Sequence, residues 1–572
     1  MRNNALKRIT TIFCALTGMT LCSVNAKTYY VDKGSAATSG DCLWTITIND
    51  PEQEHIPLNE KAFNEWFNSV KFTAGDIIKI AGGHYTYKQI TEKDNEEPIN
   101  DIPNGVTLAG SYDGTGSELR STTEGAKAWD FTHPTILDGN HQKTVLSTKS
   151  NAEAETPYTY IDGVVVCNGK NNGITGSNVD GSAGIFIQGK VEVRNCIIRN
   201  CHSKANGAGV YMMSGRLINS QITGNTQTDN VKGGGGIYID CRTNNLPSLI
   251  EDCVIESNTA TAGAGIVLTG NRSIGIVNRC IIRNNNIPVS QIADGSAIKV
   301  TTAEHIINNC LIYNNSASED ASTTRFSAIY MEHGNLLNTT VCNNIGAIFL
   351  SKNVVACQNN VCWNNTNTAG ENIIQINTVL TDKKITHNAS CDDSGIFTAE
   401  NNHILIDNKI NEGVGNVNFI KPTSFTGYAA PENPLFAQLM EEMNHADWNL
   451  NNNSVLLDKG DDTAIPNQPE ANFTKDLLSN PRIKNSGIDI GAIEFQGVGT
   501  MLEKQFVDAV LVSYQNGRIL FSENINGYVT INSLNGVLIA QKEAREGMLE
   551  VDLKPGYYLI NWNKNARIIV VR

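Results

Sequence analysis

The sequence predicts an all-β protein: a right-handed parallel β-helix solenoid followed by a small C-terminal β-sandwich. Three observations carry this prediction. The motif Cys-x-Ile-x-x-Asn, or a near copy of it, occurs seven times between residues 183 and 366. A second motif, two small residues followed by Ile-x-apolar, alternates with the first, and the same asparagine ends most copies of the first motif. Repeats with a period of about 20 to 50 residues are the sequence signature of a solenoid.

The repeating unit is expected to consist of strands. The central apolar residue of the first motif recurs at intervals of 24, 33, 27, 30, 29 and 21 residues. Each copy alternates apolar with polar residues between Gly and Asn, which is typical of strands, and no window has the i, i+3, i+4, i+7 spacing of a helix. Two or three strands per turn, stacked about 4.8 Å apart, make a parallel β-helix. Alternation then places Ile237 and Ile239 inside and Tyr238 outside.

The asparagine that ends the first motif is expected to form a ladder inside the solenoid. Asparagine tolerates left-handed backbone angles at a sharp turn, and its amide can bond to the equivalent amide one coil away. The ladder residues are Asn225, Asn258, Asn285, Asn315, Asn344 and Asn365.

Cysteines share a second equivalent position and are expected to form another internal stack. Neighbouring members lie at a spacing where a disulfide is conceivable, and buried free thiols that act as small hydrophobic side chains are the alternative. Ligands of a metal must converge, whereas these residues are strung along one axis. The stack comprises Cys196, Cys253, Cys280 and Cys310.

The first 26 residues have the pattern of a secretory signal peptide. A basic start is followed by an apolar stretch from residue 9 to 24 and by a small-residue cleavage site ending at Ala26. We therefore expect an exported protein, at the bacterial cell surface or outside the cell. The stretch is too short for a membrane anchor, and no later segment reaches the length of a transmembrane helix.

The charge of the chain limits its partners. The net charge is −14, and it becomes −17 without Arg2, Lys7 and Arg8 of the predicted signal peptide. Such an acidic protein is not expected to bind nucleic acid. An acidic glycan would need calcium or a local basic patch on the protein.

Residues 27–138 are predicted to form the N-terminal cap and the first coils, with an amphipathic helix over 58–70 that closes the open end of the coil stack. The runs Gly75-Asp76-Ile77-Ile78-Lys79-Ile80 and Gly83-His84-Tyr85 resemble the first coil of secreted pectin-lyase-like β-helix proteins. That resemblance extends over roughly residues 27 to 500 and implies the fold, with the β-helix proper at 139–432. It implies little about activity.

Residues 433–497 resemble the choice-of-anchor exit cap of bacterial surface β-helices. The motifs that carry the resemblance are Asp447-Trp448-Asn449-Leu450, Ser454 to Gly460, Arg482 and Asp489-Ile490-Gly491-Ala492-Ile493-Glu494. We expect this cap to cover the strand edges of the last coil, which would otherwise invite aggregation.

Residues 498–572 read as short alternating strands joined by glycine turns, a small β-sandwich. The motifs Leu534-Asn535-Gly536 and Gly556-Tyr557-Tyr558 and the basic-ended terminal strand resemble the C-terminal sorting domain of the type IX secretion system. This implies the type IX machinery as a partner and transport across the outer membrane. A sugar-binding sandwich is the rival interpretation.

An outward aromatic stripe on the second motif is the candidate binding face. Aromatic rings occupy five of seven equivalent outward positions, more than a surface normally exposes, and flat rings suit sugar rings. The alternative is that a loop covers the stripe. The candidate residues are Phe186, Tyr211, Tyr238, Tyr330 and Phe349.

Catalytic signatures of β-helix enzymes do not emerge, and the catalytic residues stay unknown. A lyase would need a basic side chain beside calcium-binding carboxylates on adjacent coils, and no other cofactor is expected. We therefore expect a non-catalytic, adhesin-like protein that binds a polysaccharide or another cell-surface ligand, with a pectin-lyase-like lyase or a glycoside hydrolase as the alternative. The charged residues available for such a lyase are Asp240, Glu251, Asp252, Arg279, Arg283, Asp294, Lys299 and Arg325.

Overall fold

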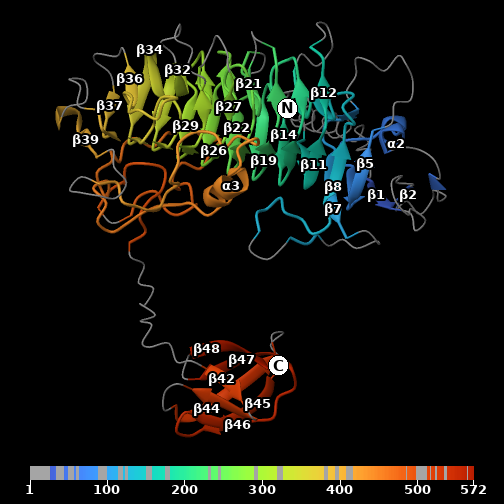
Figure 1. Ribbon diagram of the computed structural model, residues 1–572. Coiled ribbons are helices and arrows are strands. Elements are labelled where there is room, and N and C mark those ends of the chain that lie inside the picture. Colours follow the sequence, from blue (N-terminus) through green and yellow to red (C-terminus); the bar gives the residue numbers. More distant parts are fainter. Residues whose placement is uncertain are drawn as a thin grey trace, which may run out of the picture. The chain divides into compact units, whose positions relative to one another are not determined.

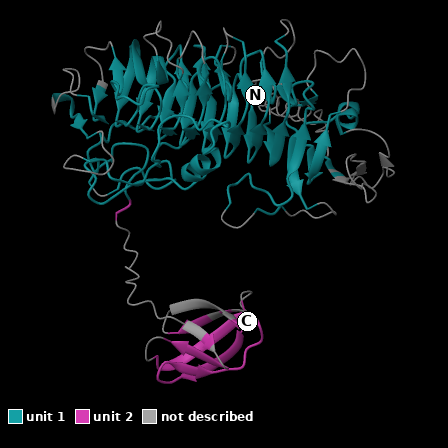
Figure 2. Cartoon of the chain, in the orientation of Figure 1, with its two compact units in different colours: residues 1–495 teal, residues 496–572 magenta. Residues whose placement is uncertain are grey.

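In a computed structural model the chain divides into two compact units, Met1–Phe495 and Gln496–Arg572 (Figure 2). The predicted signal peptide lies outside the described residues apart from Ala26. The structure describes residues 26–33, 44–48, 57–58, 63–87, 99–113, 120–122, 126–149, 157–173, 181–229, 233–242, 246–288, 294–317, 326–378, 384–392, 399–407, 416–484, 486–497, 512–515, 517–521, 525–533, 538–562 and 565–571.

The first unit is a right-handed parallel β-helix, as the sequence predicted (Figure 1). Each coil carries three strands, which stack into three rows that we call the glycine row, the middle row and the cysteine row, in the order in which the chain visits them. The cysteine row is a separate 12-stranded sheet. The other two rows join into one 22-stranded sheet, because β32 and β34 are long enough to belong to both.

The glycine row contains the strands of the second sequence motif. Its members are β6 (Asn100–Ile102), β9 (Leu146–Lys149), β13 (Ile185–Gln188), β17 (Val210–Met212), β21 (Ile237–Asp240), β24 (Ile266–Thr269), β28 (Ile298–Val300), the first halves of β32 (Ser327–Leu337) and β34 (Ala347–Gln358), and β36 (Ile376–Thr378).

The middle row was not identified from the sequence. Its members are β1 (Thr28–Lys33), β4 (Ile77–Ala81), β7 (Thr107–Tyr112), β10 (Thr159–Asp162), β14 (Val191–Arg194), β18 (Gly215–Ile218), β22 (Ser248–Glu251), β25 (Gly275–Asn278), β29 (Ile306–Asn308), the second halves of β32 and β34, and β37 (Lys384–Thr386). At its start, β2 (Trp44–Ile48) pairs antiparallel with β1, and β3 (Pro57–Leu58) pairs with β2.

The cysteine row contains the strands of the first motif. Its members are β5 (Gly83–Thr86), β8 (Thr135–Asp138), β11 (Val164–Cys167), β15 (Ile197–Arg199), β19 (Gln221–Thr223), β23 (Val254–Glu256), β26 (Ile281–Arg283), β30 (Leu311–Tyr313), β33 (Thr340–Cys342), β35 (Val361–Trp363), β38 (Ala389–Ser390) and β39 (Ile404–Leu405). Short strands follow it at the next corner: β12 (Lys170–Asn171), β16 (His202–Ser203), β20 (Thr226–Gln227), β27 (Asn286–Ile287) and β31 (Ser316–Ala317).

The asparagine ladder runs along the corner after the cysteine row. In each step the side-chain Nδ2 donates to the Oδ1 of the next coil, as from Asn285 to Asn315 at 2.9 Å. The backbone N–H of Asn285 donates to that same Oδ1 at 3.0 Å. Gln375, which the sequence analysis missed, accepts the last bond from Asn365 at 2.8 Å.

The left-handed turn lies one residue earlier than predicted. The residue before each ladder asparagine has a positive φ, for example 55° at Asn284 and 53° at Asn314, whereas the ladder asparagines do not. The expectation that the ladder asparagine makes the sharp turn is therefore wrong. One residue makes the turn, and the next is thereby aimed inward, where its amide bonds along the ladder.

The interior between the rows is a column of branched side chains. Ile185, Val210, Ile237, Ile266 and Ile298 stack in register on the glycine row, and all have no exposed surface. At the N-terminal end, α2 (Phe63–Ser69) buries Phe63, Trp66 and Phe67 against this core. The predicted helix is therefore shorter than expected, since Leu58 lies in β3.

Residues 416–495 form a segment that we call the strap, which includes most of the expected exit cap. It contains β40 (Phe419–Lys421), α3 (Phe436–Asn444) and β41 (Asp447–Leu450), and follows the last coil with η1 (Ala399–Asn401) and β39. Figure 1 shows α3 beneath the cysteine row. Strap residues Phe419, Trp448 and Ile490 pack on outward side chains of that row. This apolar cluster runs along the flank of the cysteine row and includes Ala389 and Ile406 of the last coils, and the predicted cover over the edges of the last coil stays a prediction.

Backbone carbonyls of the strap accept hydrogen bonds from side chains of the β-helix. The side-chain amides of Asn309, Asn338 and Asn359 donate to carbonyls of the strap at 2.7, 3.0 and 3.1 Å. Arg482 is fully buried and donates from Nη2 to the carbonyls of Asp489 and Gly491, both at 2.7 Å. Arg482 belongs to the sequence motif that predicted this segment, and its buried guanidinium joins two backbone carbonyls of the same motif.

The second unit is a β-sandwich, as predicted. One sheet contains β42 (Val512–Gln515), β43 (Arg518–Phe521) and β46 (Met548–Glu550), and the other contains β44 (Gly527–Ser533), β45 (Leu538–Ala544), β47 (Gly556–Trp562) and β48 (Asn565–Val571). Ile519, Val529, Ile531 and Ile560 form its core. Leu534-Asn535-Gly536 of the predicted sorting motif lies outside the described residues. None of the described helices has the length and apolar character needed to cross a bilayer.

Candidate functional site

The predicted aromatic stripe forms two separate ring stacks on the glycine row. Phe186 lies 5.6 Å from Tyr211, and Tyr211 lies 5.5 Å from Tyr238, measured between ring centroids. Tyr330 and Phe349 form the second stack at 5.3 Å. Parallel register brings equivalent residues of neighbouring coils together, so the rings lie nearly parallel to one another.

Because the rings stack on one another, the stripe does not offer an open surface on which a sugar could bind. Phe186, Tyr211 and Tyr330 are only 3, 3 and 2% exposed, while Tyr238 and Phe349 are half-buried. Both faces of Tyr211 are occupied by neighbouring rings, and its hydroxyl donates to the buried Asp240 at 2.7 Å. The expectation of an exposed aromatic binding face is therefore wrong. These rings stabilise the solenoid, and a sugar would find only their edges.

The cysteines of the predicted stack are buried free thiols. The thiols of Cys253, Cys280 and Cys310 donate to carbonyls two residues earlier, at 3.3, 3.3 and 3.2 Å. Ser220 occupies the equivalent position between Cys196 and Cys253, and its hydroxyl accepts from the N–H of Cys196. Burial raises the pKa of the Cys196 thiol to about 12, so this thiol is unreactive at neutral pH.

The charges considered for a lyase form structural ion pairs. Arg279 binds Asp252 at 2.7 Å and Glu251 at 3.3 Å, and Lys299 binds Asp294 at 3.1 Å. Arg283 also donates to the Met443 carbonyl of the strap at 2.9 Å. Arg325 lies outside the described residues. In the described part of the chain, no three or more His, Cys, Asp or Glu side chains are arranged to hold a metal ion.

A pocket of about 340 Å³ opens where the strap meets the middle row. Its polar walls come from Tyr158 before β10, Lys190 before β14, Arg216 of β18 and Glu470 of the strap. The remaining lining is apolar or lacks a side chain: Gly189, Gly215, Leu246, Pro247, Leu249 and Pro469. The register pairs Thr159 with Val191, which explains why Tyr158 and Lys190 lie next to each other.

The pocket combines groups that usually bind polyhydroxylated ligands. The Tyr158 side chain is 40% exposed, and its ring stacks on Tyr160 at 6.0 Å between centroids. Arg216 is 38% exposed and reaches Glu192 at 3.5 Å through Nη1. Among the described residues, Nε of Arg216 and Oε2 of Glu470 are buried and have no hydrogen-bond partner. Since both of these atoms are closed to solvent, the open part of the site consists of the Tyr158 ring and the outer part of the Arg216 side chain.

A strip of paired charges continues from the pocket along the middle row. Asp162 accepts from Arg120 at 3.0 Å, from Asn195 at 2.9 Å and from Arg194 at 2.9 Å. Burial alone would raise the pKa of Asp162, but these hydrogen bonds outweigh it and lower the pKa. Burial would lower the pKa of Arg194, but Asp162 and Glu192 raise it, so this guanidinium stays charged.

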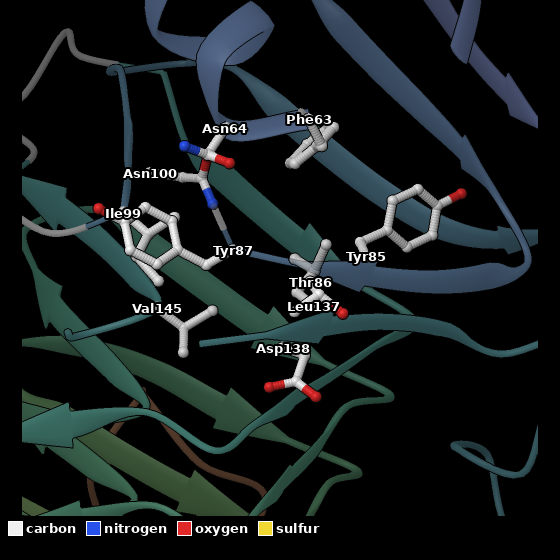
Figure 3. A pocket seen from close by; sticks show the side chains of 10 residues that line it. All are labelled: Phe63, Asn64, Tyr85, Thr86, Tyr87, Ile99, Asn100, Leu137, Asp138 and Val145. Atoms are coloured by element: carbon white, nitrogen blue, oxygen red, sulfur yellow. The ribbon is translucent and has the colours of Figure 1, made fainter. Parts of the chain in front are cut away.

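A second cavity, at the N-terminal end, is far smaller. It has a volume of about 10 Å³, room for a single water molecule, and lies between α2, the strands β5 and β8 and the start of β6. Figure 3 shows the side chains of Asn64 and Asn100 pointing toward one another across it. On its margin, His84 Nε2 lies 2.8 Å from Asp138 Oδ2. This cavity suits an internal water and is too small for a glycan.

The sequence contained part of the signal for the larger pocket. Tyr160, Glu192 and Arg216 hold one equivalent outward position on successive middle-row strands, and a search for a third strand per coil would have found this column. The contribution of Glu470 could not be predicted from the sequence, because the repeat does not indicate which later segment returns to this flank.

Comparison with known proteins agrees with the fold. The family model described as the right-handed β-helix region matches residues 160–345. Among solved structures, the crystal structure of pectate lyase Pel9A is similar, with a TM-score of 0.37 and 13% identity over 76% of this chain and 90% of that chain. No curated protein sequence matches the chain. At this TM-score the likeness to the pectate lyase says nothing about activity, and the chain is a right-handed parallel β-helix with a C-terminal β-sandwich.

Proposed function

We propose that this β-helix protein binds a glycan, without cleaving it, in the pocket bounded by Tyr158, Lys190, Arg216 and Glu470. The observation that carries the proposal is the composition of that pocket: an exposed aromatic ring, two cationic side chains and one carboxylate around an apolar floor. Aromatic faces bind the apolar faces of sugar rings, and a few placed polar groups give orientation. This pocket, and not the aromatic stripe, is therefore the proposed glycan-binding site.

Two cationic side chains in the pocket favour a glycan with acidic groups. The chain as a whole is strongly acidic, with a net charge of −14, so an anionic polymer is repelled at long range. Lys190 and Arg216 supply the local positive charge that overcomes this repulsion at the pocket. Binding should therefore tighten when moderate salt screens the long-range repulsion, and weaken again when high salt screens the contacts.

Catalysis by a lyase or a hydrolase is the competing function. Proton abstraction by an arginine requires a neutral guanidine at least transiently, and Arg194, in the charge strip beside the pocket, has carboxylate partners that raise its pKa instead. A general acid and base pair needs two carboxyl groups that flank the substrate. Glu470 is the one carboxyl group that lines the pocket among its described residues, which supports binding over cleavage.

Affinity electrophoresis of the full chain in gels with polygalacturonate, alginate, chondroitin sulfate, xylan or mixed-linkage glucan tests the proposal. We expect retardation by at least one acidic polymer, and its loss in Tyr158→Ala and in Lys190→Ala/Arg216→Ala. The matched control is Tyr528→Ala, which removes a 70% exposed tyrosine of the C-terminal unit. No retardation by any polymer would contradict the proposal. Release of unsaturated uronides or reducing ends would replace it with an enzyme.

We also propose that the chain is exported through the type IX machinery and presented at the bacterial surface. The sequence of residues 1–26 and the strand pattern of residues 498–572 support this. Surface proteolysis of intact cells, with N-terminal sequencing of the mature protein, tests the proposal. We expect a mature chain that begins at Lys27 and is digested from outside. Retention inside the cell of a chain that lacks residues 498–572 would support their role in sorting, and unchanged export of that chain would contradict it.

A further inference from the structure

Five charged side chains form one alternating chain of ion pairs in the strip beside the pocket. Arg120 lies 3.0 Å from Asp162, and Asp162 lies 2.9 Å from Arg194. Arg194 lies 2.9 Å from Glu192, which in turn lies 3.5 Å from Arg216. The chain of ion pairs begins and ends with a guanidinium, so its three positive charges face two negative ones. It therefore carries one positive charge in excess, on a protein whose net charge is −14.

The two ends of this chain of ion pairs have different surroundings. The Arg120 side chain is 19% exposed, and its guanidinium carbon lies 4.6 Å from the centre of the Phe131 ring and 5.6 Å from that of the Tyr112 ring. Aromatic rings in this position stabilise a cation that has lost part of its water. Arg216, at the other end, is 38% exposed, lines the pocket and pairs with Glu192. The excess positive charge is therefore open to an anionic ligand at the pocket end.

Arg194, in the middle of the chain of ion pairs, offers a second positive position just outside the pocket. Its side chain is 39% exposed, and its Nε and Nη1 donate to Asp162 and Glu192. Its Nη2 has no hydrogen-bond partner among the described residues and is open to solvent. Its guanidinium carbon lies 5.1 Å from the centre of the Tyr160 ring, which stacks on the pocket residue Tyr158. Arg194 therefore borders the pocket and keeps N–H groups available for a ligand.

The spacing of the positive side chains determines which ligands can reach both positions. Lys190 lines the pocket, and Arg194 follows it by four residues at the end of β14. At about 3.3 Å per residue, their Cα atoms lie at most about 13 Å apart. A single acidic sugar is shorter than this span, whereas an oligosaccharide with acidic groups on several residues can extend across it. Two acidic groups of one glycan chain can therefore be bound at the same time.

We infer that Arg194 forms a second subsite beside the pocket, so that the protein binds two acidic sugar residues of the same glycan chain. One acidic group binds to Lys190 and Arg216 in the pocket, and the other binds to the open Nη2 of Arg194. The inference rests on the proposed function and adds to it a binding residue and the length of glycan required. Once the first group is bound, the second contact forms within the same complex at a high effective concentration. Affinity should therefore rise steeply with chain length and level off when both subsites are filled.

Isothermal titration calorimetry of the full chain tests this inference with oligomers of increasing length, prepared from polygalacturonate, alginate and chondroitin sulfate. For at least one series we expect the affinity of the wild type to rise at least tenfold at the length that reaches Arg194, and then to level off. Arg194→Gln should weaken binding of the long oligomers by at least the same factor and leave that of the short ones unchanged. Arg194→Lys, which keeps the charge and loses the planar fork of N–H groups, should lie between the two.

The matched control is Arg545→Gln. Arg545 is an 81% exposed arginine of the C-terminal unit that is also ion-paired, to Glu543. This variant removes the same charge at a distance from the pocket in sequence and should bind oligomers of every length like wild type. The unchanged affinity of Arg194→Gln for short oligomers serves as the check that the pocket of this variant is folded.

The outcomes separate this inference from the proposed function. Binding that depends on Tyr158 and Lys190 but does not rise with length, or a rise that Arg194→Gln leaves in place, would overturn the second subsite and leave glycan binding in the pocket intact. Equal weakening of short and long oligomers by Arg194→Gln would mean that Arg194 only positions the carboxylates beside it, and this result would also overturn the inference. A wild-type protein that binds no oligomer of any series would overturn both.

Discussion

One column of outward side chains on the middle row has two halves of opposite character. The equivalent positions on β10, β14 and β18 hold Tyr160, Glu192 and Arg216, and the next three strands hold Leu249, Ile276 and Ile306. The second half lies under Phe473 of the strap, whereas in the first half Arg216 lines the pocket and keeps 38% of its side chain exposed. The backbone is the same in both halves. What differs is whether another segment of the chain covers the side chains, and the residue types follow that difference.

The largest expected effect comes from placing a charged side chain in the covered half of the column. Ile276 has no exposed surface, so Ile276→Glu would bury an unpaired carboxylate beneath the strap. We expect a loss of at least about 4 kcal/mol in the free energy of unfolding, or release of the strap. The reciprocal change, Arg216→Leu, should alter stability by less than about 0.5 kcal/mol. Urea unfolding, followed by tryptophan fluorescence, compares the two. Equal losses would show that the halves do not differ in burial.

Removal of the covering ring should have the next largest effect. Phe473 is 4% exposed and packs with Leu249, Ile276 and Ile306. Phe473→Ala leaves a cavity over these three side chains and should cost about 3 kcal/mol. Phe436→Ala, at a half-buried ring of α3, is the control and should cost less. Hydrogen exchange of β22, β25 and β29 should rise in the first variant, and unchanged exchange would mean that the strap does not protect this flank.

The strap and the middle row should also respond to pH in opposite directions. Burial, with the charge of Asp489 beside it, raises the pKa of Glu494 in the strap to about 8. A carboxyl group with a raised native pKa contributes stability that is complete below its unfolded pKa, near 4.3, and is lost as pH rises through about 8. We expect the Tm to fall by on the order of 2 °C between pH 6 and pH 9, and Glu494→Gln to remove this fall. A pH-independent wild type would contradict the assignment.

Asp162, on β10 of the middle row, should give a pH dependence of stability with the opposite sign. Its native pKa is lowered, so its stabilising contribution is present above the unfolded pKa near 3.9 and disappears as pH falls through the native value. Asp162→Asn should therefore destabilise the chain at neutral pH and have no effect in strong acid. Thermal melts of both proteins between pH 2 and pH 7 measure the difference, which should vanish at the acidic end.

The smallest effect is expected at Glu192. Its carboxylate bonds to Arg194 at 2.9 Å and approaches Arg216 at 3.5 Å, and both arginines are more than a third exposed. Pairs of this kind contribute at most about 1 kcal/mol. Glu192→Ala should leave stability within that range while it tightens binding of an acidic glycan, because it removes the carboxylate beside Arg216 of the pocket. A stability loss as large as that of Phe473→Ala would mean that the first half is also covered.

Features that repeat from coil to coil can be predicted from the sequence, and features that do not repeat cannot. Strand alternation placed Ile237 and Ile239 inside, and the spacing of Asn225 to Asn365 placed the ladder. The turn was misassigned by one residue because consecutive asparagines such as Asn284 and Asn285 look alike in sequence, although one takes a left-handed φ and the other points inward. The middle row escaped notice because its strands have no fixed motif.

The candidate site was harder to predict, for a physical reason. Alternation assigns a side chain to the outside of a coil, and it does not say what lies beyond. Tyr211 and Leu249 are both outward, and both are covered: the first by neighbouring rings, the second by a segment more than two hundred residues later in the chain. Contacts of the second kind have no local signal. A return segment becomes visible in sequence only through unexplained apolar residues at outward positions, such as Ile276 and Ile306.

The asparagine ladder also bears on how a chain of this kind changes its length. Each ladder amide donates to one neighbour and accepts from the other, so every rung offers the same interface above and below. If a whole coil is deleted or duplicated between two ladder asparagines, the asparagines that become neighbours can form the same amide-to-amide hydrogen bond. The strap sets a limit to this freedom, because it bonds to Asn309, Asn338 and Asn359 at fixed intervals. Gene duplications that lengthen the protein should therefore be tolerated in its first half and selected against in its second.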